Sequence, residues 1–446
     1  MRHIFKKWTV AVLAALACTV LSGCFLSSPI DELYQLPQLP QEYTALSEEI
    51  NAVLAGGAEY AAPISGSNLQ PVQMVDIDGD GKEEALAFFR NATAEKPLQI
   101  YIFSPLDEGY VCSAVIEGAG TYINSVSYSD INGNGISELI VGWKISPEVQ
   151  MISLYGFVGG TVSEHISAAY SQYTVSDLDG DALQELVVFR GDEEGGTVAD
   201  YYNWQNEAVE LVGSARVSST LAELTKLTPG TLRDGAKALF VSGIEESGVM
   251  VTDILVMKDG VWSNITLQDS TGVSSEIFRF VSLYPKDING DGVMEIPQPV
   301  LMPLRGEDEE AYAVKWCSYN DDNEPLEAMT TYHNTADSWY LILPEEWENR
   351  VTVSRARKYT DQMDTSFYYY DPATETWVEF MVISKMTGDN REYRAGRGGN
   401  AVINLQSDAV YTVRYPEETV WREAMDVDEI KSNFGLILSD WSSGMY

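Results

Sequence analysis

Four copies of one nine-residue phrase organise the chain, and the first reads Asp76-Ile77-Asp78-Gly79-Asp80-Gly81-Lys82-Glu83-Glu84. The other three are Asp130-Ile131-Asn132-Gly133-Asn134-Gly135-Ile136-Ser137-Glu138, Asp177-Leu178-Asp179-Gly180-Asp181-Ala182-Leu183-Gln184-Glu185 and Asp287-Ile288-Asn289-Gly290-Asp291-Gly292-Val293-Met294-Glu295. Each copy places carboxylate or amide oxygens at positions 1, 3 and 5 and a glutamate at position 9. Glycine fills positions 4 and 6 except at Ala182, which is consistent with a sharp turn.

This arrangement of oxygen atoms is typical of a calcium site. A hard cation such as Ca²⁺ takes about six to eight oxygen ligands, and alternate side chains of a tight loop can point inward at it. The backbone carbonyl at position 7 would add one oxygen in each loop. The predicted ligands are Asp76, Asp78, Asp80, Lys82 and Glu84; Asp130, Asn132, Asn134, Ile136 and Glu138; Asp177, Asp179, Asp181, Leu183 and Glu185; and Asp287, Asn289, Asp291, Val293 and Glu295.

The EF-hand shares the opening of this phrase but is excluded by the residues after it. An EF-hand needs a bidentate glutamate at position 12 and a helix on each side. Position 12 is occupied by Ala87, Val141, Val188 and Gln298. The residues after the first three loops are apolar and β-prone, as in Ala85-Leu-Ala-Phe-Phe89, and predict short strands.

The spacing of the loops predicts a repeat architecture. The first three loops start 54 and 47 residues apart, and the fourth starts 110 residues after the third. The long interval contains a degenerate copy around Asp234-Gly235, which has lost the oxygens at positions 1, 3 and 9, so we expect no metal there. Five units of roughly 50 residues, each with room for four short strands, fit the blades of a β-propeller.

The phrase Asp-x-Asp-Gly-Asp-Gly-x-x-Glu followed by a strand resembles the FG-GAP/VCBS-type repeat of calcium-binding propellers, including the heads of integrin α-chains. The resemblance covers residues 60–332 and implies a calcium-stabilised propeller that acts as a binding or scaffolding module. We predict about five blades. The last unit offers three strands after Glu295, so we expect the N-terminal strand 69–75 to complete it and close the ring, which would remove an exposed sheet edge.

The N-terminus has the features of an exported lipoprotein. Residues 1–23 combine a basic start with an apolar run at 8–21 that is short for a membrane span. The run ends in Leu21-Ser22-Gly23-Cys24, which resembles the bacterial lipobox and implies lipidation of Cys24, although an ordinary cleaved signal is the alternative. We therefore expect an extracytoplasmic protein held at the cell membrane by its lipid, with a tether and short helix over 24–59.

The net formal charge of −39 argues against nucleic acid and anionic lipid surfaces as partners. The loop carboxylates account for part of this charge. Outside the export signal and Cys24, only Cys112 and Cys317 are present. They lie in the first and last repeat units, and two buried thiols are favoured over a disulfide.

Residues 337–446 lack the loop and predict a small α+β domain of alternating strands. Ser338 to Trp347 resembles the opening "strand-Leu-Pro-x-x-Trp" of domains with the fold of PsbP proteins. Apolar spacing over 418–434 predicts a helix. Arg355, Arg357 and Lys358 suggest a basic face, for which a solvated surface is the simpler interpretation.

Few residues support catalysis. Outside the export signal the histidines are His165 and His333, which is thin material for a Ser-His-Asp or zinc site. The prediction is therefore a surface lipoprotein that binds an extracellular protein or polysaccharide, with calcium as its only cofactor. The alternative is an extracellular carbohydrate-active enzyme that uses paired propeller carboxylates. The 25 tyrosines and 10 tryptophans suit a carbohydrate-binding surface, and propeller cores use the same residues.

Overall fold

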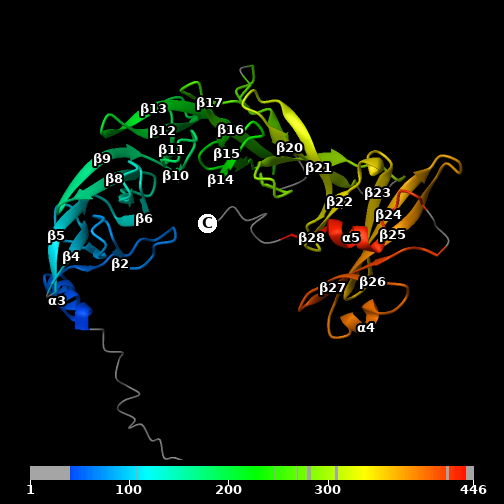
Figure 1. Cartoon of the computed structure of the whole chain (residues 1–446), viewed down its shortest axis with the longest axis horizontal. Coiled ribbons are helices and arrows are strands. Elements are labelled where there is room, and N and C mark those ends of the chain that lie inside the picture. Colours follow the sequence, from blue (N-terminus) through cyan, green and yellow to red (C-terminus); the bar gives the residue numbers. More distant parts are fainter. Residues whose placement is uncertain are drawn as a thin grey trace, which may run out of the picture.

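The structure, a computed structural model, describes residues 41–437 except 108, 247, 269, 279–282, 307–309 and 418–420. The described chain forms six separate antiparallel sheets, of which the first five follow one another along an open arc (Figure 1). The predicted export signal, Cys24 and the tether to residue 40 lie outside the described residues. No helix within the described part is both long and apolar enough to cross a membrane.

The predicted N-terminal helix is confirmed as α3 (Gln41–Ala55). Its apolar face buries Leu46 and Ile50 against Ala85, Phe89 and Phe103 of the first sheet. The helix ends before Gly57, whose φ of +95° favours glycine. Burial of this face fixes the helix against the outer side of the arc's first sheet, because α3 contacts β5 (Gly109–Gly118).

Each of the five repeat units contributes one sheet, whose strands are consecutive in the chain. The first contains β2 (Val72–Val75), β3 (Glu84–Arg90), β4 (Leu98–Leu106) and β5, with the two-residue β1 (Glu59–Tyr60) also paired to β3. The second contains β6 (Tyr122–Ser129), β7 (Glu138–Lys144), β8 (Gln150–Val158) and β9 (Thr161–Ala169). The third contains β10 (Gln172–Ser176), β11 (Glu185–Gly191), β12 (Thr197–Gln205) and β13 (Ala208–Val217).

The fourth sheet, from the degenerate unit, contains β14 (Leu224–Thr231), β15 (Lys237–Ile244), β16 (Met250–Lys258) and β17 (Val261–Asn264), with β18 (Glu276–Phe278) paired to β16. The fifth runs in the order β19 (Glu295–Leu301), β20 (Tyr312–Tyr319), β21 (Pro325–Asn334), β22 (Trp339–Leu343) and β28 (Phe434–Leu436). The strands predicted directly after each loop are therefore confirmed as β3, β7, β11, β15 and β19.

The cores of the arc lie between neighbouring sheets rather than inside single sheets. Strands β3, β7 and β11 carry side chains that are buried on both faces, because each of these sheets stacks against its neighbours. One apolar cluster joins the first and second sheets, another the second and third, another the third and fourth, and another the fourth and fifth. This two-sided burial explains why the strands read as continuous apolar runs instead of alternating ones.

The prediction of a closed five-bladed propeller is wrong. The N-terminal strand does not reach the fifth sheet, since β2 pairs with β3 in the first sheet, with Val72 opposite Ala87 and Val75 opposite Glu84. At the other end, β22 and β28 extend the fifth sheet beyond β21. Both elements that could join the ends are thus used locally, and the first and fifth sheets stand at opposite ends of the arc (Figure 1).

The C-terminal part begins differently from the prediction as well. Strand β22, which the sequence places in the C-terminal domain, pairs with β21 in the fifth sheet. The sixth sheet is ordered β23 (Val351–Tyr359), β24 (Gln362–Asp371), β25 (Thr376–Thr387), β27 (Ala409–Arg414) and β26 (Ala401–Leu405). One apolar cluster around Tyr332, Trp339, Trp347 and Phe367 joins the fifth and sixth sheets, so they share a core.

Two short helices accompany this sheet, α4 (Arg391–Ala395) and α5 (Val427–Asn433). Of the helix predicted over 418–434, the described residues 421–434 form α5 at Val427–Asn433, where Asp426 accepts hydrogen bonds from Asp428 and Glu429 in a capping box. Strand β28 follows α5 directly and returns to β22. Both cysteines are free thiols, and only one fits the prediction: Cys317 is buried, whereas Cys112 is exposed on β5.

Candidate metal centres

Each of the four predicted loops leads directly into the strand that follows it, β3, β7, β11 or β19, and the four adopt similar turn geometries. In the first loop the Asp76 carboxylate accepts the Gly79 N–H at 2.7 Å and the Gly81 N–H at 3.0 Å. Positions 3 and 5 each accept an N–H two residues further on, as Asp78 does from Asp80. The fourth loop repeats both position-1 bonds, the third repeats the bond from position 4, and in the second Asp130 accepts from Asn134 and Gly135. The position-3 bond recurs in all of them, so the position-1 and position-3 side chains fold inward over the turn.

Two loops bring three carboxylates together. Oxygens of Asp76, Asp78 and Glu84 all lie within 4.8 Å of one another, and so do those of Asp177, Asp179 and Glu185. These residues occupy positions 1, 3 and 9. The position-5 residues Asp80 and Asp181 stand outside both groups, although the sequence predicts them as ligands. The position-7 carbonyls of Lys82, Ile136, Leu183 and Val293 are still predicted ligands, which no contact in the structure tests.

The position-9 glutamate is buried in every loop. The exposed fraction is 1% for Glu84, 4% for Glu138 and 0% for both Glu185 and Glu295. One carboxylate oxygen accepts the N–H of the position-2 residue, as Glu185 Oε2 does from Leu178 at 2.7 Å. The other oxygen, Oε1, of Glu185 and of Glu295 is buried without a hydrogen-bond partner.

A buried carboxylate of this kind is electrostatically unfavourable unless a cation neutralises it. Burial, opposed by the bond from Ile77 and reinforced by Asp78, Asp80 and Asp76, raises the pKa of Glu84 to about 7. Burial also raises the pKa of Glu185 and of Glu295 to about 7, and it raises the pKa of Glu138. The donor set of hard oxygens with a buried, unpartnered carboxylate oxygen fits a hard cation such as Ca²⁺.

The loops with asparagine at position 3 are arranged differently. In the second loop the Asn132 amide donates to Glu138, and in the fourth loop the Asn289 amide donates to Asp291 at 2.9 Å. Each bond satisfies one carboxylate oxygen of its loop, while Glu295 Oε1 stays without a partner. Asparagine in place of aspartate also leaves fewer negative charges to attract a cation. Calcium affinity rises with the number of charged ligands, so the first and third loops are the better candidate sites.

The first three loops are also part of the contact between neighbouring sheets. Ile77 lies in the apolar cluster shared by the first and second sheets, Ile131 in that of the second and third, and Leu178 in that of the third and fourth. These are the position-2 residues whose N–H groups bind the buried glutamates. The acidic group and the apolar contact between sheets are therefore held by the same short segment.

Successive loops contact each other directly. A Cβ atom added to Gly79 would lie 2.6 Å from the Ile136 side chain, and one added to Gly133 would lie 2.4 Å from Leu183. The position-7 side chain of one loop thus packs on the position-4 glycine of the preceding loop. This contact explains the glycine at position 4 in these two loops, where any side chain would push the loops apart. Sequence spacing alone did not predict it.

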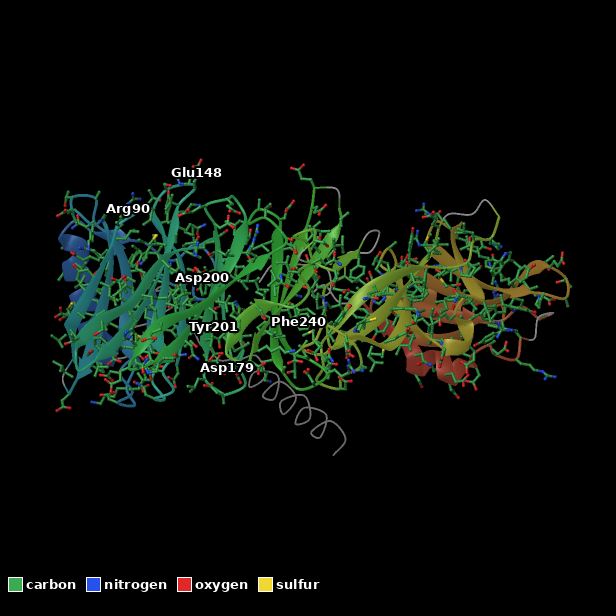
Figure 2. The ribbon with its side chains drawn as sticks, turned by 90° about the horizontal axis from the view of Figure 1, so that it is seen from above. Arg90, Glu148, Asp179, Asp200, Tyr201 and Phe240 are labelled. Atoms are coloured by element: carbon green, nitrogen blue, oxygen red, sulfur yellow. The ribbon has the colours of Figure 1, made fainter. Side chains whose placement is uncertain are left out.

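Two further residues at the third loop were missed by sequence reasoning because they belong to a later strand. The Tyr201 hydroxyl and the Asn203 amide of β12 donate to Asp179 Oδ2 at 3.3 and 3.4 Å. Figure 2 shows Tyr201 close to Asp179 at one rim of the arc, while Glu148 lies at the opposite rim. These donors orient Asp179 and strengthen the third loop as a preformed site.

The degenerate copy keeps the turn and replaces the acidic group. Leu232 takes the place of the position-2 residues, since it is buried in the cluster between the fourth and fifth sheets. Asp234 accepts the Ala236 N–H at 3.1 Å and the Asp321 N–H at 2.8 Å. Backbone hydrogen bonds thus hold this loop, consistent with the expectation that it needs no metal.

Ala182 occupies a backbone conformation that favours glycine. Its φ is +70°, and the glycines at the same position of the other loops, Gly81, Gly135 and Gly292, have φ of +85°, +85° and +86°. We expect Ala182→Gly to raise the free energy of unfolding by about 0.5–1 kcal/mol, because glycine adopts the left-handed conformation without strain. The greater conformational entropy of glycine in the unfolded chain offsets part of this gain. Urea unfolding checks the value, with Ala236→Gly as the control, and a decrease at Ala182 would contradict it.

The two histidines that could have served catalysis lie in separate sheets. His165 on β9 packs edge-to-face on Trp204, and His333 on β21 lies beside Trp316 and Tyr340. Thr331 is bonded to His333 Nδ1 at 3.0 Å. Burial lowers the pKa of His333 to about 3 and also lowers that of His165. Both rings act as packing groups among aromatic side chains.

Comparisons with known proteins give little further guidance. No family model matches the chain, and no curated protein matches it either. The solved structure of an exotype rhamnogalacturonan lyase, YesX, is similar at a TM-score of 0.29 and 14% sequence identity, over 72% of this chain and 66% of that one. The chain thus covers slightly less than two thirds of the lyase. A TM-score this low carries no argument about fold or function.

Proposed function

We propose that this protein is an extracytoplasmic binding module whose repeat loops hold calcium ions. The observation that carries the proposal is the buried position-9 glutamate, which in the third and fourth loops has one oxygen without a hydrogen-bond partner. In the third loop this glutamate lies with Asp177 and Asp179 in one group of oxygens. A divalent cation would neutralise the group and supply the missing contact.

The proposed role of the cation is to hold neighbouring sheets together. Glu84, Glu138 and Glu185 bind the N–H groups of Ile77, Ile131 and Leu178, which insert into the clusters between sheets. Without a cation, repulsion among the carboxylates would open the turn and withdraw the apolar residue from its cluster. Calcium bound at the loops would therefore stabilise the arc as a rigid surface for a ligand.

The localisation is part of the same proposal and rests on the sequence. The lipobox-like Leu21-Ser22-Gly23-Cys24 supports a lipid anchor at Cys24. We expect fatty-acid labelling of the protein in cells to be lost in Cys24→Ala, since that thiol is the proposed attachment point. Labelling that persists in Cys24→Ala would contradict the anchor.

Calorimetric titration of the metal-depleted protein with Ca²⁺ tests the metal proposal. We expect at most four sites of unequal affinity. The loops at 76–84 and 177–185 should be strongest, because each groups three carboxylates, and the loop at 130–138 should be weakest, because it has two carboxylates in all. Mg²⁺ is the control cation. Five equivalent sites, or no calcium-dependent heat, would contradict the proposal.

A further inference from the structure

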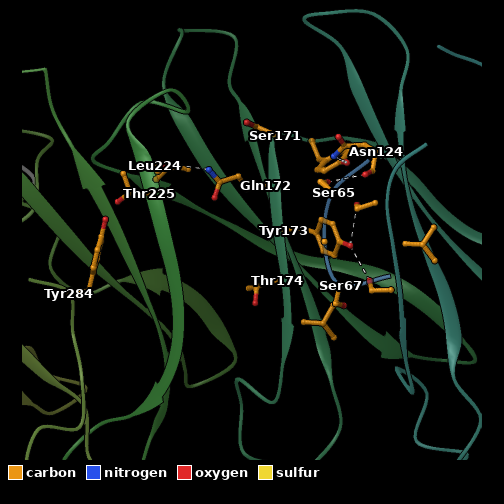
Figure 3. A pocket seen from close by; sticks show the side chains of 16 residues that line it. Ser65, Ser67, Asn124, Ser171, Gln172, Tyr173, Thr174, Leu224, Thr225 and Tyr284 are labelled. Atoms are coloured by element: carbon orange, nitrogen blue, oxygen red, sulfur yellow. Dashed lines mark hydrogen bonds between the residues drawn. The ribbon is translucent and has the colours of Figure 1, made fainter. Parts of the chain in front are cut away.

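A cavity of about 870 Å³ lies on the concave side of the arc, and no residue of the four metal loops lines it. It spans the inner strands of three successive sheets, β6, β10 and β14, with the segment before β2 on one side and Tyr284 on the other. Figure 3 shows Tyr173 and Thr174 in the middle of this surface, with Ser65 and Ser67 beyond Tyr173 and Thr225 and Tyr284 opposite. The cavity therefore exists only when neighbouring sheets keep their relative positions.

The lining of this cavity is uncharged and combines polar with apolar surface. Its side chains are hydroxyl and amide groups, three tyrosine rings and a few small apolar groups, contributed by Ser65, Gly66, Ser67, Asn124, Ser125, Val126, Ser127, Tyr170, Ser171, Gln172, Tyr173, Thr174, Val175, Leu224, Thr225 and Tyr284. The chain as a whole has 21% charged residues and a net charge of −39. One charged group beside this surface is Lys226, whose ammonium group lies over the Tyr284 ring at 5.0 Å.

Several of these groups are already held in place by hydrogen bonds. The Tyr173 hydroxyl is bonded to Ser127 at 3.0 Å and to Ser125 at 3.4 Å, so β10 is linked to β6. The Asn124 amide donates to the Tyr170 hydroxyl at 3.0 Å. The Gln172 amide donates to the Leu224 carbonyl at 3.1 Å, which links β10 to β14. The side chains at the cavity are thus preorganised across three sheets.

The backbone of β10 adds to the same surface. Within the described residues, β10 pairs with β11 on one side only, so it is the edge strand of the third sheet. Alternate N–H and C=O groups of an edge strand point away from the sheet and are available to a ligand. Together with the hydroxyl and amide side chains, they offer both donors and acceptors in a concave site.

We infer that this cavity binds a neutral oligosaccharide, an inference that rests on the proposed role of the protein as a binding module. A sugar presents hydroxyl groups that both donate and accept hydrogen bonds, which matches the serine, threonine, asparagine and glutamine lining. Its apolar ring faces can lie on the partly exposed Tyr173, whose ring combines an apolar face with a polar tip. A charged ligand would find no countercharge among the lining side chains, and a largely apolar ligand would leave their polar groups unpaired.

The same chemistry favours binding over cleavage and a sugar over a peptide. Hydrolysis of a glycosidic bond typically uses two carboxylic acids beside the bond, whereas the lining groups are hydroxyls and amides. A peptide added to the edge of β10 would need pockets for its alternate side chains, and this surface is hydroxyl-covered instead. The carboxylates of the metal loops belong to the rim rather than to this cavity.

Calorimetric titration of the calcium-saturated full chain tests the inference. The probes are cellohexaose, mannohexaose and maltohexaose as neutral ligands, hexagalacturonate as a charged ligand of similar size, and a mixture of extended peptides. We expect at least one neutral hexasaccharide to bind, and hexagalacturonate and the peptides not to bind. No binding by any neutral hexasaccharide, or preference for hexagalacturonate or peptide, would overturn the inference.

Variants place the binding in the cavity. Tyr173→Ala and the cavity-filling Thr174→Trp should each weaken binding at least tenfold, while Tyr173→Phe, which keeps the ring, should lose less. The control Tyr359→Ala changes an exposed tyrosine on β23 of the sixth sheet and should bind as the parent does. Wild-type binding by a folded Thr174→Trp would overturn the site. Because calcium binding is measured separately, loss of the sugar result leaves the metal proposal intact, and loss of the metal result leaves this one intact.

Discussion

Removal of calcium is expected to lower the melting temperature of this protein by about 5–10 °C. A ligand that binds only the folded state stabilises it by RT ln(1 + [L]/Kd), which is about 2.7 kcal/mol for one site at a free concentration one hundred times Kd. Two strong loops would then contribute about 5 kcal/mol. The melting temperature shifts by about 1–2 °C per kcal/mol for a cooperative unit of this length, so chelation should lower it by ~5–10 °C.

The effect should reach beyond the loops. Because the fifth and sixth sheets share one apolar core around Trp339 and Phe367, the C-terminal part is not expected to melt independently of the arc. Scanning calorimetry with calcium and with EDTA gives the shift and shows how many transitions there are. Unchanged melting in metal-depleted protein would contradict the calcium interpretation of the whole repeat set.

A pair of substitutions locates the effect. Asp76→Ala with Asp177→Ala should reproduce most of the chelator shift, because it removes the position-1 carboxylate from both three-carboxylate groups. The matched control is Asp234→Ala in the degenerate loop, which loses similar turn hydrogen bonds to Ala236 and Asp321. The control should lower the melting temperature by the same few degrees with and without calcium. Equal calcium dependence in both variants would count against the loops as the sites.

The second large effect is that Glu185→Gln should destabilise the protein in calcium but not in EDTA. In calcium, Glu185→Gln should lower the free energy of unfolding by about 2–3 kcal/mol, because the third loop loses a charged ligand. In EDTA at pH 8 the same substitution should be neutral or stabilising. Without a cation the Glu185 carboxylate is buried, its Oε1 lacks a hydrogen bond, and Asp177 and Asp179 repel it. An uncharged amide of the same shape avoids that repulsion.

A buried glutamate outside the loops provides the control for this reversal. Glu276 on β18 is buried, and its two oxygens accept hydrogen bonds from Ser275 and Gln298 at 3.0 and 3.1 Å. Glu276→Gln should therefore have the same effect in calcium and in EDTA. Urea unfolding of both variants in both conditions measures the four differences. If Glu185→Gln destabilises equally in calcium and in chelator, the carboxylate serves the turn and holds no cation.

Much of the local structure was predictable because its causes are local. The Asp-x-Asp-Gly phrase specifies a turn through hydrogen bonds between residues two to five positions apart, such as Asp76 to Gly79 and Gly81. The apolar runs after the loops specify strands, and the interval between loops specifies four-stranded units. The exception at Ala182 was visible in the sequence, and the structure shows that it adopts the left-handed conformation of the glycines at the same position. The partial grouping of the ligands was less predictable, since only positions 1, 3 and 9 meet in the first and third loops.

The sequence by itself determined the repeat, the turn of each loop, the strand after each loop and the candidate metal ligands, all of which depend on contacts at short separation. Only the tertiary structure decided that the arc stays open, because β2 and β22 could each pair either locally or across the ring, and strand patterns are the same in both cases. The concave cavity is likewise a product of the tertiary structure. Its hydroxyl groups come from three sheets about 50 residues apart, as Tyr173, Ser125 and Thr225 do, and no single segment carries its pattern.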